Sequence, residues 1–192
     1  SYIQVFNKNE EYLYHFDIKT PEDKYFSIPT TFVLTGEEEL IVADALNGVK
    51  IFSKDGTFFG KVSLKFKDEY SEYEMENIYI TDMDIESNGN VFMLLNCGTD
   101  GCPTFIVYST KKKKVISMIP TSDQFLGIGT CFSIQDSYLY LCLANLYYEL
   151  KPTSCSFGIK FKIVGKTQKI YLKPEEFFYG EESYINRNAC RE

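Results

Sequence analysis

The sequence predicts an all-β protein built from repeated four-stranded antiparallel units. Three observations support this: 16 Phe and 15 Tyr without any Trp, short apolar runs separated by turn residues, and one strand order that recurs along the chain. Aromatic and β-branched residues favour the half-buried surface of a strand. No long window carries apolar residues at helical spacing, and a helical turn is expected only within residues 174–184.

The clearest unit is Leu40–Leu64, LIVADALNGVKIFSKDGTFFGKVSL. An apolar strand is followed by a turn at Asn47-Gly48, a second strand, a tight turn over Lys54–Gly56 and a third strand. This pattern predicts an antiparallel meander.

The same order recurs with a period of about 45 residues, which is typical of a propeller-like β array. Val5–Asn9 matches Ile51–Asp55, so residues 3–18 are expected to be the third and fourth strands of a unit. Complete units are expected at 26–64, 78–120 and 129–172, followed by a tail at 173–192, within one domain spanning 1–192. The last two strands of the third complete unit are expected at 146–151 and 158–164.

Two arrangements remain open for the ends of the array. The hairpin of residues 158–172 pairs with residues 3–18 and closes a four-bladed ring, or the chain is part of a larger propeller. Open arrays associate through bare sheet edges and faces, so self-association is expected in the second case. We favour the second arrangement.

The charge pattern excludes some partners. A net charge of -7 would repel a phosphate backbone, so no nucleic-acid partner is expected. The basic run Lys111–Lys114 lies where a hairpin turn is needed and is interpreted as a solvated turn. No apolar stretch approaches the roughly 20 residues that span a bilayer.

The segment ADALNGVKIFSKDGTFFG, residues 43–60, resembles an NHL-type repeat. An Asp-ending strand leads through an Asn-containing turn to a V-x-V-F-like strand and then to an Asp-Gly turn. The resemblance is good over 40–60, fair over 3–16 and 82–119, and weak over 129–164; the Asn-His-Leu signature itself is absent. It implies a β-propeller, usually of six blades, that serves as a platform for protein, RNA or glycan partners, with some enzyme relatives.

Few residues suit catalysis. His15 is the single histidine and is interpreted as a partly exposed strand residue, so Ser-His and Cys-His nucleophile pairs are close to excluded. Among Asp44, Asp82 and Asp84 a carboxylate pair for glycoside hydrolysis can be imagined, but their spacing fixes no separation. Tyr138 and Tyr140, with Tyr147 and Tyr148, are candidates for an aromatic binding surface. An enzyme is not the favoured class.

A metal prediction concerns Asp82 and Asp84. In strand periodicity they share one face with Glu86, and their oxygens could hold a hard cation such as Ca²⁺. The competing interpretation is that Met83 and Ile85 face the core while the acids are solvated.

The six cysteines allow fifteen pairings. Cys97 and Cys102 flank a compact turn, CGTDGC, that could bring them to the roughly 5.5 Å Cα separation of a disulfide. Cys142 is interpreted at least equally well as a small buried hydrophobe. A bridge between Cys97 and Cys102 favours an extracellular or otherwise oxidising compartment, with the cytoplasm as the alternative.

The leading functional prediction is a non-enzymatic binding or scaffold module without a cofactor. Its inter-strand loops, above all Lys65–Glu76 and Asn96–Thr104, are expected to meet a protein or glycan partner. The alternative is a cation-dependent propeller enzyme, a hydrolase or lyase, with Asp82 and Asp84 near the propeller axis.

Overall fold

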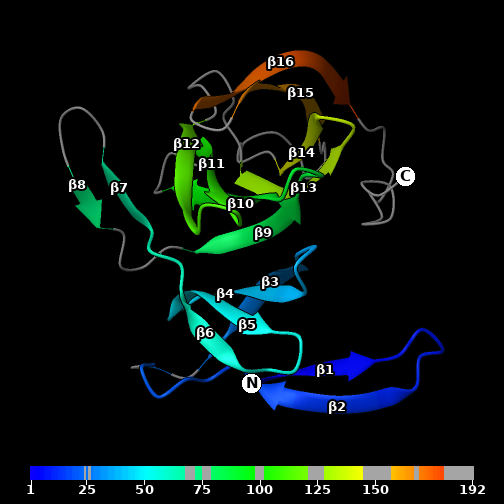
Figure 1. Ribbon diagram of the computed structural model, residues 1–192. Helices are drawn as coiled ribbons and strands as arrows, with labels where there is room; N and C mark the ends of the chain where they lie inside the picture. The colour runs from blue at the N-terminus through cyan, green and yellow to red at the C-terminus, as the bar shows by residue number, and fades with distance from the viewer. Residues whose placement is uncertain are drawn as a thin grey trace, which may run out of the picture. The chain divides into compact units, whose positions relative to one another are not determined.

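The computed structural model describes residues 1–23, 25, 27–67, 72–74, 79–97, 102–120, 128–144, 157–166 and 169–179. All regular structure in these ranges is β, arranged as antiparallel sheets of two or four strands (Figure 1). The predicted all-β, propeller-like array of four-stranded antiparallel sheets is confirmed. The chain divides into two compact units, Ser1–Ile80 and Thr81–Glu192, which are described separately.

The first unit holds a hairpin and a four-stranded sheet. The hairpin pairs β1 (Tyr2–Phe6) with β2 (Tyr12–Asp17). The sheet follows chain order through β3 (Pro29–Leu34), β4 (Glu39–Asp44), β5 (Gly48–Ser53) and β6 (Phe58–Lys61). The short strands β7 (Lys65–Lys67) and β8 (Glu72–Glu74) form a further pair.

Period-two alternation explains how the hairpin meets the sheet. Leu40 and Phe52 are register partners, so their side chains share one face of the sheet. On that face they form a buried cluster with Val42 and Ile18, against which Ile3 and Phe16 of the hairpin pack. The Phe16 and Phe52 ring centroids lie 5.8 Å apart. One face of the hairpin is therefore the cover of this sheet.

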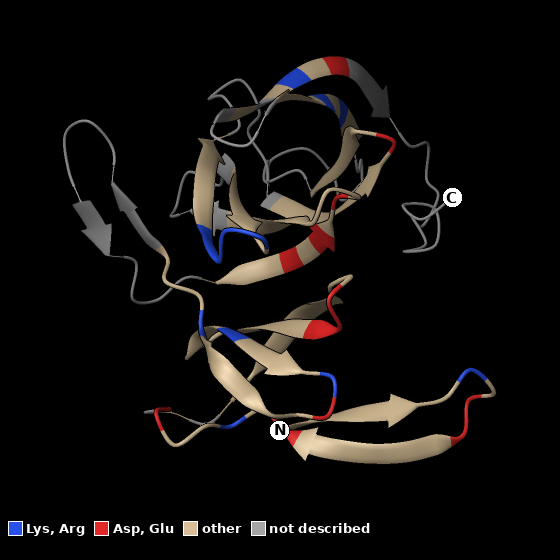
Figure 2. Cartoon of the chain, in the orientation of Figure 1, with Lys and Arg blue, Asp and Glu red and all other residues tan. Residues whose placement is uncertain are grey.

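The second unit contains two four-stranded sheets. One runs through β9 (Ile80–Ile85), β10 (Asn90–Cys97), β11 (Cys102–Ser109) and β12 (Lys114–Pro120). The other runs through β13 (Ile128–Gln135), β14 (Tyr138–Ala144), β15 (Phe157–Lys166) and β16 (Lys169–Tyr179). The basic run Lys111–Lys114 lies mostly in the β11–β12 turn, as expected, with Lys111 and Lys112 exposed (Figure 2).

These two sheets pack against each other. Phe105 of β11 packs edge-on against Phe132 of β13, with ring centroids 5.0 Å apart, inside a shared apolar core. At the outer strands, the Ser117 hydroxyl of β12 donates to the Ile170 carbonyl of β16. Asp82 of β9 accepts a hydrogen bond from the main chain of β13. The first strands of the two sheets therefore lie next to each other, and so do the last strands.

Two expectations about the C-terminal region are wrong. The hairpin of β15 and β16 continues the sheet from β14. These strands are the third and fourth of their sheet, whereas 158–164 was expected as the fourth, because short apolar runs look alike in sequence. Residues 174–179 extend β16 instead of forming a helical turn, and the expected third strand at 146–151 lies outside the described residues.

Candidate functional site

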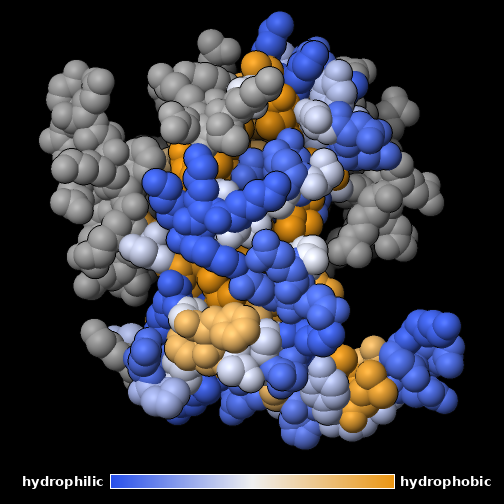
Figure 3. All heavy atoms as spheres, in the orientation of Figure 1, coloured by the Kyte–Doolittle hydropathy of each residue, from blue (hydrophilic) through white to orange (hydrophobic). Residues whose placement is uncertain are grey.

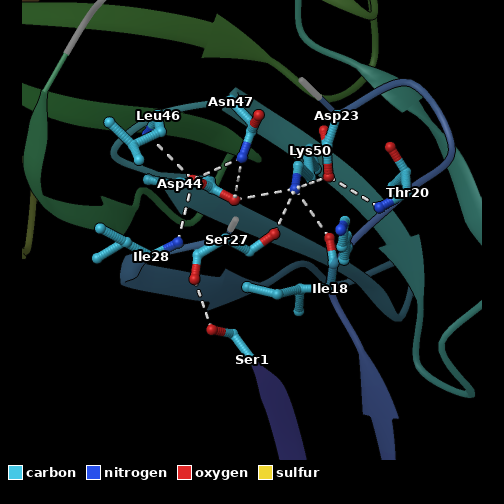
Figure 4. Close-up of polar contacts among 12 residues, drawn as sticks. Ser1, Ile18, Thr20, Asp23, Ser27, Ile28, Asp44, Leu46, Asn47 and Lys50 are labelled. Atoms are coloured by element: carbon cyan, nitrogen blue, oxygen red, sulfur yellow. Dashed lines mark hydrogen bonds and ion pairs between the residues drawn. The ribbon is translucent and has the colours of Figure 1, made fainter. Parts of the chain in front are cut away.

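A buried lysine and two carboxylates form the most elaborate polar cluster in the first unit (Figure 4). Lys50 lies in β5, Asp44 ends β4, and Asp23 comes from the segment between β2 and β3. All three side chains are fully buried. The Lys50 ammonium lies 2.6 Å from Asp23 Oδ2 and 2.9 Å from Asp44 Oδ2.

Further contacts complete the coordination of the ammonium. Lys50 Nζ donates to the Ile18 carbonyl at 2.8 Å and lies 3.3 Å from Ser27 Oγ. Four oxygen acceptors thus surround a group with three protons. Lys61 Nζ lies 3.0 Å from the other oxygen of Asp23, which balances the second carboxylate.

The surroundings keep Asp44 ionised. Burial alone raises the pKa of Asp44, but hydrogen bonds from Lys50, the Leu46 N–H, the Asn47 amide and the Ile28 N–H lower it to about 2. For Asp23 burial also raises the pKa, and Lys50, the Thr20 N–H and Lys61 together bring it below its ordinary value. Both carboxylates are therefore charged partners of Lys50 at neutral pH.

This cluster is suited to structure more than to chemistry. The ammonium is sealed from solvent and already bonded, so it cannot reach a substrate as a nucleophile or base. It ties Ile18, Asp23 and Ser27 to the sheet, which fixes the path of the segment between β2 and β3. Asp44, considered above as a member of a carboxylate pair, has its oxygens committed to this cluster.

Sequence analysis missed the cluster. Lys50 sits in the apolar run VKIF, where strand periodicity places it on the same face as buried Phe52. A charge at a core position requires partners. That pattern would have indicated a buried ion pair, although not which loop supplies Asp23.

Asp82 and Asp84 join two sheets of the second unit. They lie on β9, where Figure 2 shows acidic positions in red. The Phe132 N–H donates to Asp82 Oδ2 at 3.0 Å, and the Ile134 N–H donates to Asp84 Oδ2 at 2.7 Å. The other oxygens accept the N–H groups of Met83 and Ile85.

These bonds satisfy main-chain donors along the outer edge of β13. The same strand pairs with β14 on its other side, so the carboxylates take the place of a further strand. Asp82 and Asp84 are both half-buried rather than fully solvated, while Met83 is buried, as the competing interpretation expects. Within the described ranges no group of three or more His, Cys, Asp or Glu side chains is suited to a metal ion, and calcium binding stays a prediction.

An aromatic surface occupies the outer side of the first hairpin. Its side chains, all exposed, are those of Tyr2, Phe6, Tyr12 and His15. Figure 3 also shows hydrophobic residues at the surface over β1 and β2. Tyr12 Oη lies 2.6 Å from His15 Nδ1, and the Tyr2 and His15 ring centroids are 5.3 Å apart. His15 is the exposed strand residue that the sequence predicts, in contact with tyrosines.

A second exposed apolar area lies on β3. Leu34 of β3 pairs with Leu40 of β4, which in turn pairs with Phe52 of β5. Leu34 is 58% exposed, whereas Leu40 and Phe52 are 7% and 1% exposed. In the neighbouring row Phe32 is 56% exposed beside a fully buried Val42. We call Phe32 and Leu34 the open face. The hairpin β1–β2 covers this side of the sheet over β4 and β5 but leaves β3 uncovered.

The edge of β1 that faces away from β2 is open in the described residues, where β2 is its one partner. The Ile18 N–H donates to the Ser1 carbonyl. Hydrogen-bonded pairs alternate along an antiparallel ladder, so the main-chain groups of Tyr2 and Gln4 point away from β2.

The structure describes only part of the predicted cysteine pair, binding loops and tyrosine surface. Cys97 and Cys102 face each other as register partners in the β10–β11 ladder, while their side chains and residues 98–101 lie outside the described part. In the loop Lys65–Glu76 only the backbone of β7 and β8 is described. Tyr138 and Tyr140 share a face of β14, with the Lys160 ammonium 4.6 Å from the Tyr138 ring; Tyr147 and Tyr148 lie outside the description.

Comparisons with known proteins inform the fold alone. No family model and no curated protein matches the chain. Among solved structures, hydrazine synthase from Kuenenia stuttgartiensis superposes with a TM-score of 0.59 at 10% identity, over 94% of this chain and 44% of that one. A protein of unknown function from Bacteroides caccae gives a TM-score of 0.46 at 11% identity, over 88% of this chain and 67% of the other.

The chain thus spans less than half of the hydrazine synthase chain. This likeness, together with the repeated four-stranded sheets, supports a propeller-like fold. Within the described residues, no helix has the length and apolar character needed to cross a membrane. The comparisons therefore show a likeness in fold class and in nothing finer.

Proposed function

We propose that this chain is a non-enzymatic binding module whose partner is a polypeptide that supplies a β-hairpin along β1. The observation that carries the proposal is the exposure of Phe32 and Leu34 on a sheet face whose other members are buried. Exposed apolar side chains that continue a packed face mark a surface with a missing cover. The open edge of β1 supplies the hydrogen bonds for that cover.

The position of the hairpin follows from the repeat. Val5–Asn9 matches Ile51–Asp55, so β1 corresponds to β5, whose inner neighbour is β4. A strand added to β1 would take the place that β4 takes beside β5, and a second strand the place of β3. In the other unit, the first strands of the two sheets lie next to each other, and so do the last strands. By the same order, the added pair would continue the cover from β1 toward β3, on the open face.

The chemistry of the partner follows from its two neighbours. One side of the added hairpin meets Phe32 and Leu34, and the other continues the aromatic surface that includes Tyr2 and Phe6. Both sides therefore favour apolar side chains. A second copy pairing through its own β1 fits poorly, because two-fold symmetry would bring its β3 and β4 into the space of the first copy's.

Several finer assignments belong to this proposal. Membership of the NHL-type repeats rests on residues 43–60, and an extracellular location rests on the cysteines. The loops Lys65–Glu76 and Asn96–Thr104 remain candidate contacts for a protein or glycan partner. A glycan stacked on the aromatic surface is the competing ligand. No contact in the described residues favours the cation-dependent enzyme.

A peptide copy of residues 29–45 is the sharpest probe, because it carries β3, β4 and their turn. By the repeat, Val33 and Ile41 of the peptide would face Phe32 and Leu34 of the chain. We expect saturable binding of the fluorescein-labelled peptide, measured by anisotropy. The matched controls are a Val33→Ser, Ile41→Ser peptide and a Phe32→Ser, Leu34→Ser chain, each of which should lose binding.

Two results would overturn the proposal. One is an unchanged anisotropy at peptide concentrations up to the solubility limit. The other is equal binding by the Phe32→Ser, Leu34→Ser chain, which would place the contact elsewhere. A change of tyrosine fluorescence with cello-oligosaccharides but not with the peptide would favour the glycan partner instead.

A further inference from the structure

Every cysteine in the described part of the chain stands opposite another cysteine. In the β10–β11 ladder Cys97 is the register partner of Cys102, and in the β13–β14 ladder Cys131 is the register partner of Cys142. Sequence spacing suggests the first pair. The second pair is eleven positions apart and becomes visible only through the register.

Backbone geometry suits a bridge between Cys131 and Cys142. Directly opposite residues of an antiparallel ladder have Cα atoms about 4.5 or 5.5 Å apart, and their side chains leave the same face. Disulfides span Cα separations of about 4.4–6.8 Å. A register shift lies immediately before the pair, between Gly129 and Cys131, so the local twist differs from that of a regular ladder.

The two thiols differ in access. Cys131 is half-buried, whereas Cys142 is 4% exposed. The next pair along, Phe132 and Leu141, points into the apolar core, so the cysteines occupy the opposite face of the sheet. A reagent from solvent therefore meets Cys131 first.

We infer that Cys131 and Cys142 are a dithiol pair that closes into a cross-strand disulfide by exchange with a small-molecule disulfide. The Cys131 thiolate attacks one sulfur of oxidised glutathione, whose S–S bond breaks and releases one glutathione thiol. The Cys142 thiolate then attacks Cys131 Sγ, displacing the second glutathione thiol. Two protein thiols are oxidised and one small disulfide is reduced to two thiols, so atoms and electrons balance.

Closure would fix a strand that also carries contacts to the neighbouring sheet. Cys131 directly precedes Phe132, whose N–H binds Asp82, and Ile134 binds Asp84 from the same strand. A covalent link to β14 restrains the register at the shift beside Gly129. The oxidised chain should therefore exchange its β13 amide protons more slowly than the reduced chain.

The experiment uses the full chain in buffers containing reduced or oxidised glutathione. Remaining thiols are alkylated, the protein is digested, and disulfide-linked peptides are identified by mass spectrometry. We expect a Cys131–Cys142 linked peptide in oxidised glutathione and its loss in the reduced buffer. A chain with Cys97, Cys102, Cys155 and Cys190 replaced by Ser keeps only Cys131 and Cys142. This chain should form the same link, which shows that the other four cysteines are not needed for it.

Single variants separate the two roles. Cys142→Ser should accumulate a glutathione adduct on Cys131, while Cys131→Ser should leave the buried Cys142 unmodified until the chain is denatured. Circular dichroism checks that each variant is folded. Failure of the wild-type chain to form the link, or a link from Cys131 to another cysteine, overturns the inference whether or not the variants fold.

Discussion

The carboxylate of Asp84 in β9 accepts a hydrogen bond from the main-chain N–H of Ile134, the residue fifty positions later in β13. Asp82 does the same for Phe132. Two side chains on one strand thus satisfy alternate donors of an edge strand in another sheet. Hydrogen bonds to charged acceptors contribute more than neutral ones.

Removal of either carboxylate should destabilise the unit of residues 81–192. We expect Asp84→Ala and Asp82→Ala each to lower the free energy of unfolding by about 1–3 kcal/mol, because a partly buried N–H loses its acceptor. Urea unfolding followed by tyrosine fluorescence measures the change. Glu175→Ala, at an exposed position of β16, is the matched control and should leave the midpoint unchanged. Equal midpoints for Asp84→Ala and wild type would contradict the prediction.

The same variants test calcium binding. The oxygens of Asp82 and Asp84 already accept main-chain N–H groups, so a cation would have to replace those bonds. We expect the thermal midpoint to be the same in calcium and in a chelator. A calcium-dependent rise in wild type that Asp82→Ala and Asp84→Ala abolish would instead support the cation site.

The sequence predicted the repeated sheets because turn residues and period-two runs are local signals. It also selected Asp82 and Asp84, since their spacing places them on one face. Their acceptor role was hidden because the donors are main-chain groups of another sheet, which no side-chain pattern reports. The strands at 157–166 and 169–179 were also misassigned. Several apolar runs look alike in sequence, and only their long-range pairing in the sheet determines which one becomes the third or fourth strand.

Replacing Lys50 should lower the free energy of unfolding far more than replacing an exposed lysine near the same strand. Lys50→Met would leave Asp23 and Asp44 as buried carboxylates without their shared cation, at a cost of about 3–5 kcal/mol. Lys54→Met, which breaks the exposed pair with Glu38, is the control and should leave the urea midpoint unchanged. Similar losses in both variants would show that the buried cluster contributes nothing special.

Stability of the first unit should fall in acid. Asp44 has a pKa of about 2 in the folded chain against an ordinary value of 3.8, so its contribution is present above 3.8 and is lost as pH falls toward 2. The shift corresponds to about 2 kcal/mol. The lowered pKa of Asp23 acts in the same direction. Carboxyl carbon shifts in an NMR titration measure the Asp44 pKa directly, and a midpoint near 3.8 would refute the prediction.

Gly56 supports the docking of the first hairpin, because a Cβ built there would meet the Phe16 ring. Its φ of 90° is also unfavourable for a residue with a side chain. Gly48 has a similar φ of 77° but open space around the Cβ position, so it reports the backbone cost alone. The difference between Gly56→Ala and Gly48→Ala therefore isolates the clash with Phe16.

We expect Gly56→Ala to destabilise the first unit more than Gly48→Ala, and to do so by loosening the hairpin. The displaced Phe16 would lose its contact with Phe52, and the Tyr14 hydroxyl its hydrogen bond to the Lys54 carbonyl. Hydrogen exchange should then accelerate across β1 and β2 in Gly56→Ala while staying at the wild-type rate in Gly48→Ala. Equal exchange in the two variants would mean that the hairpin is held to the sheet without the close approach at Gly56.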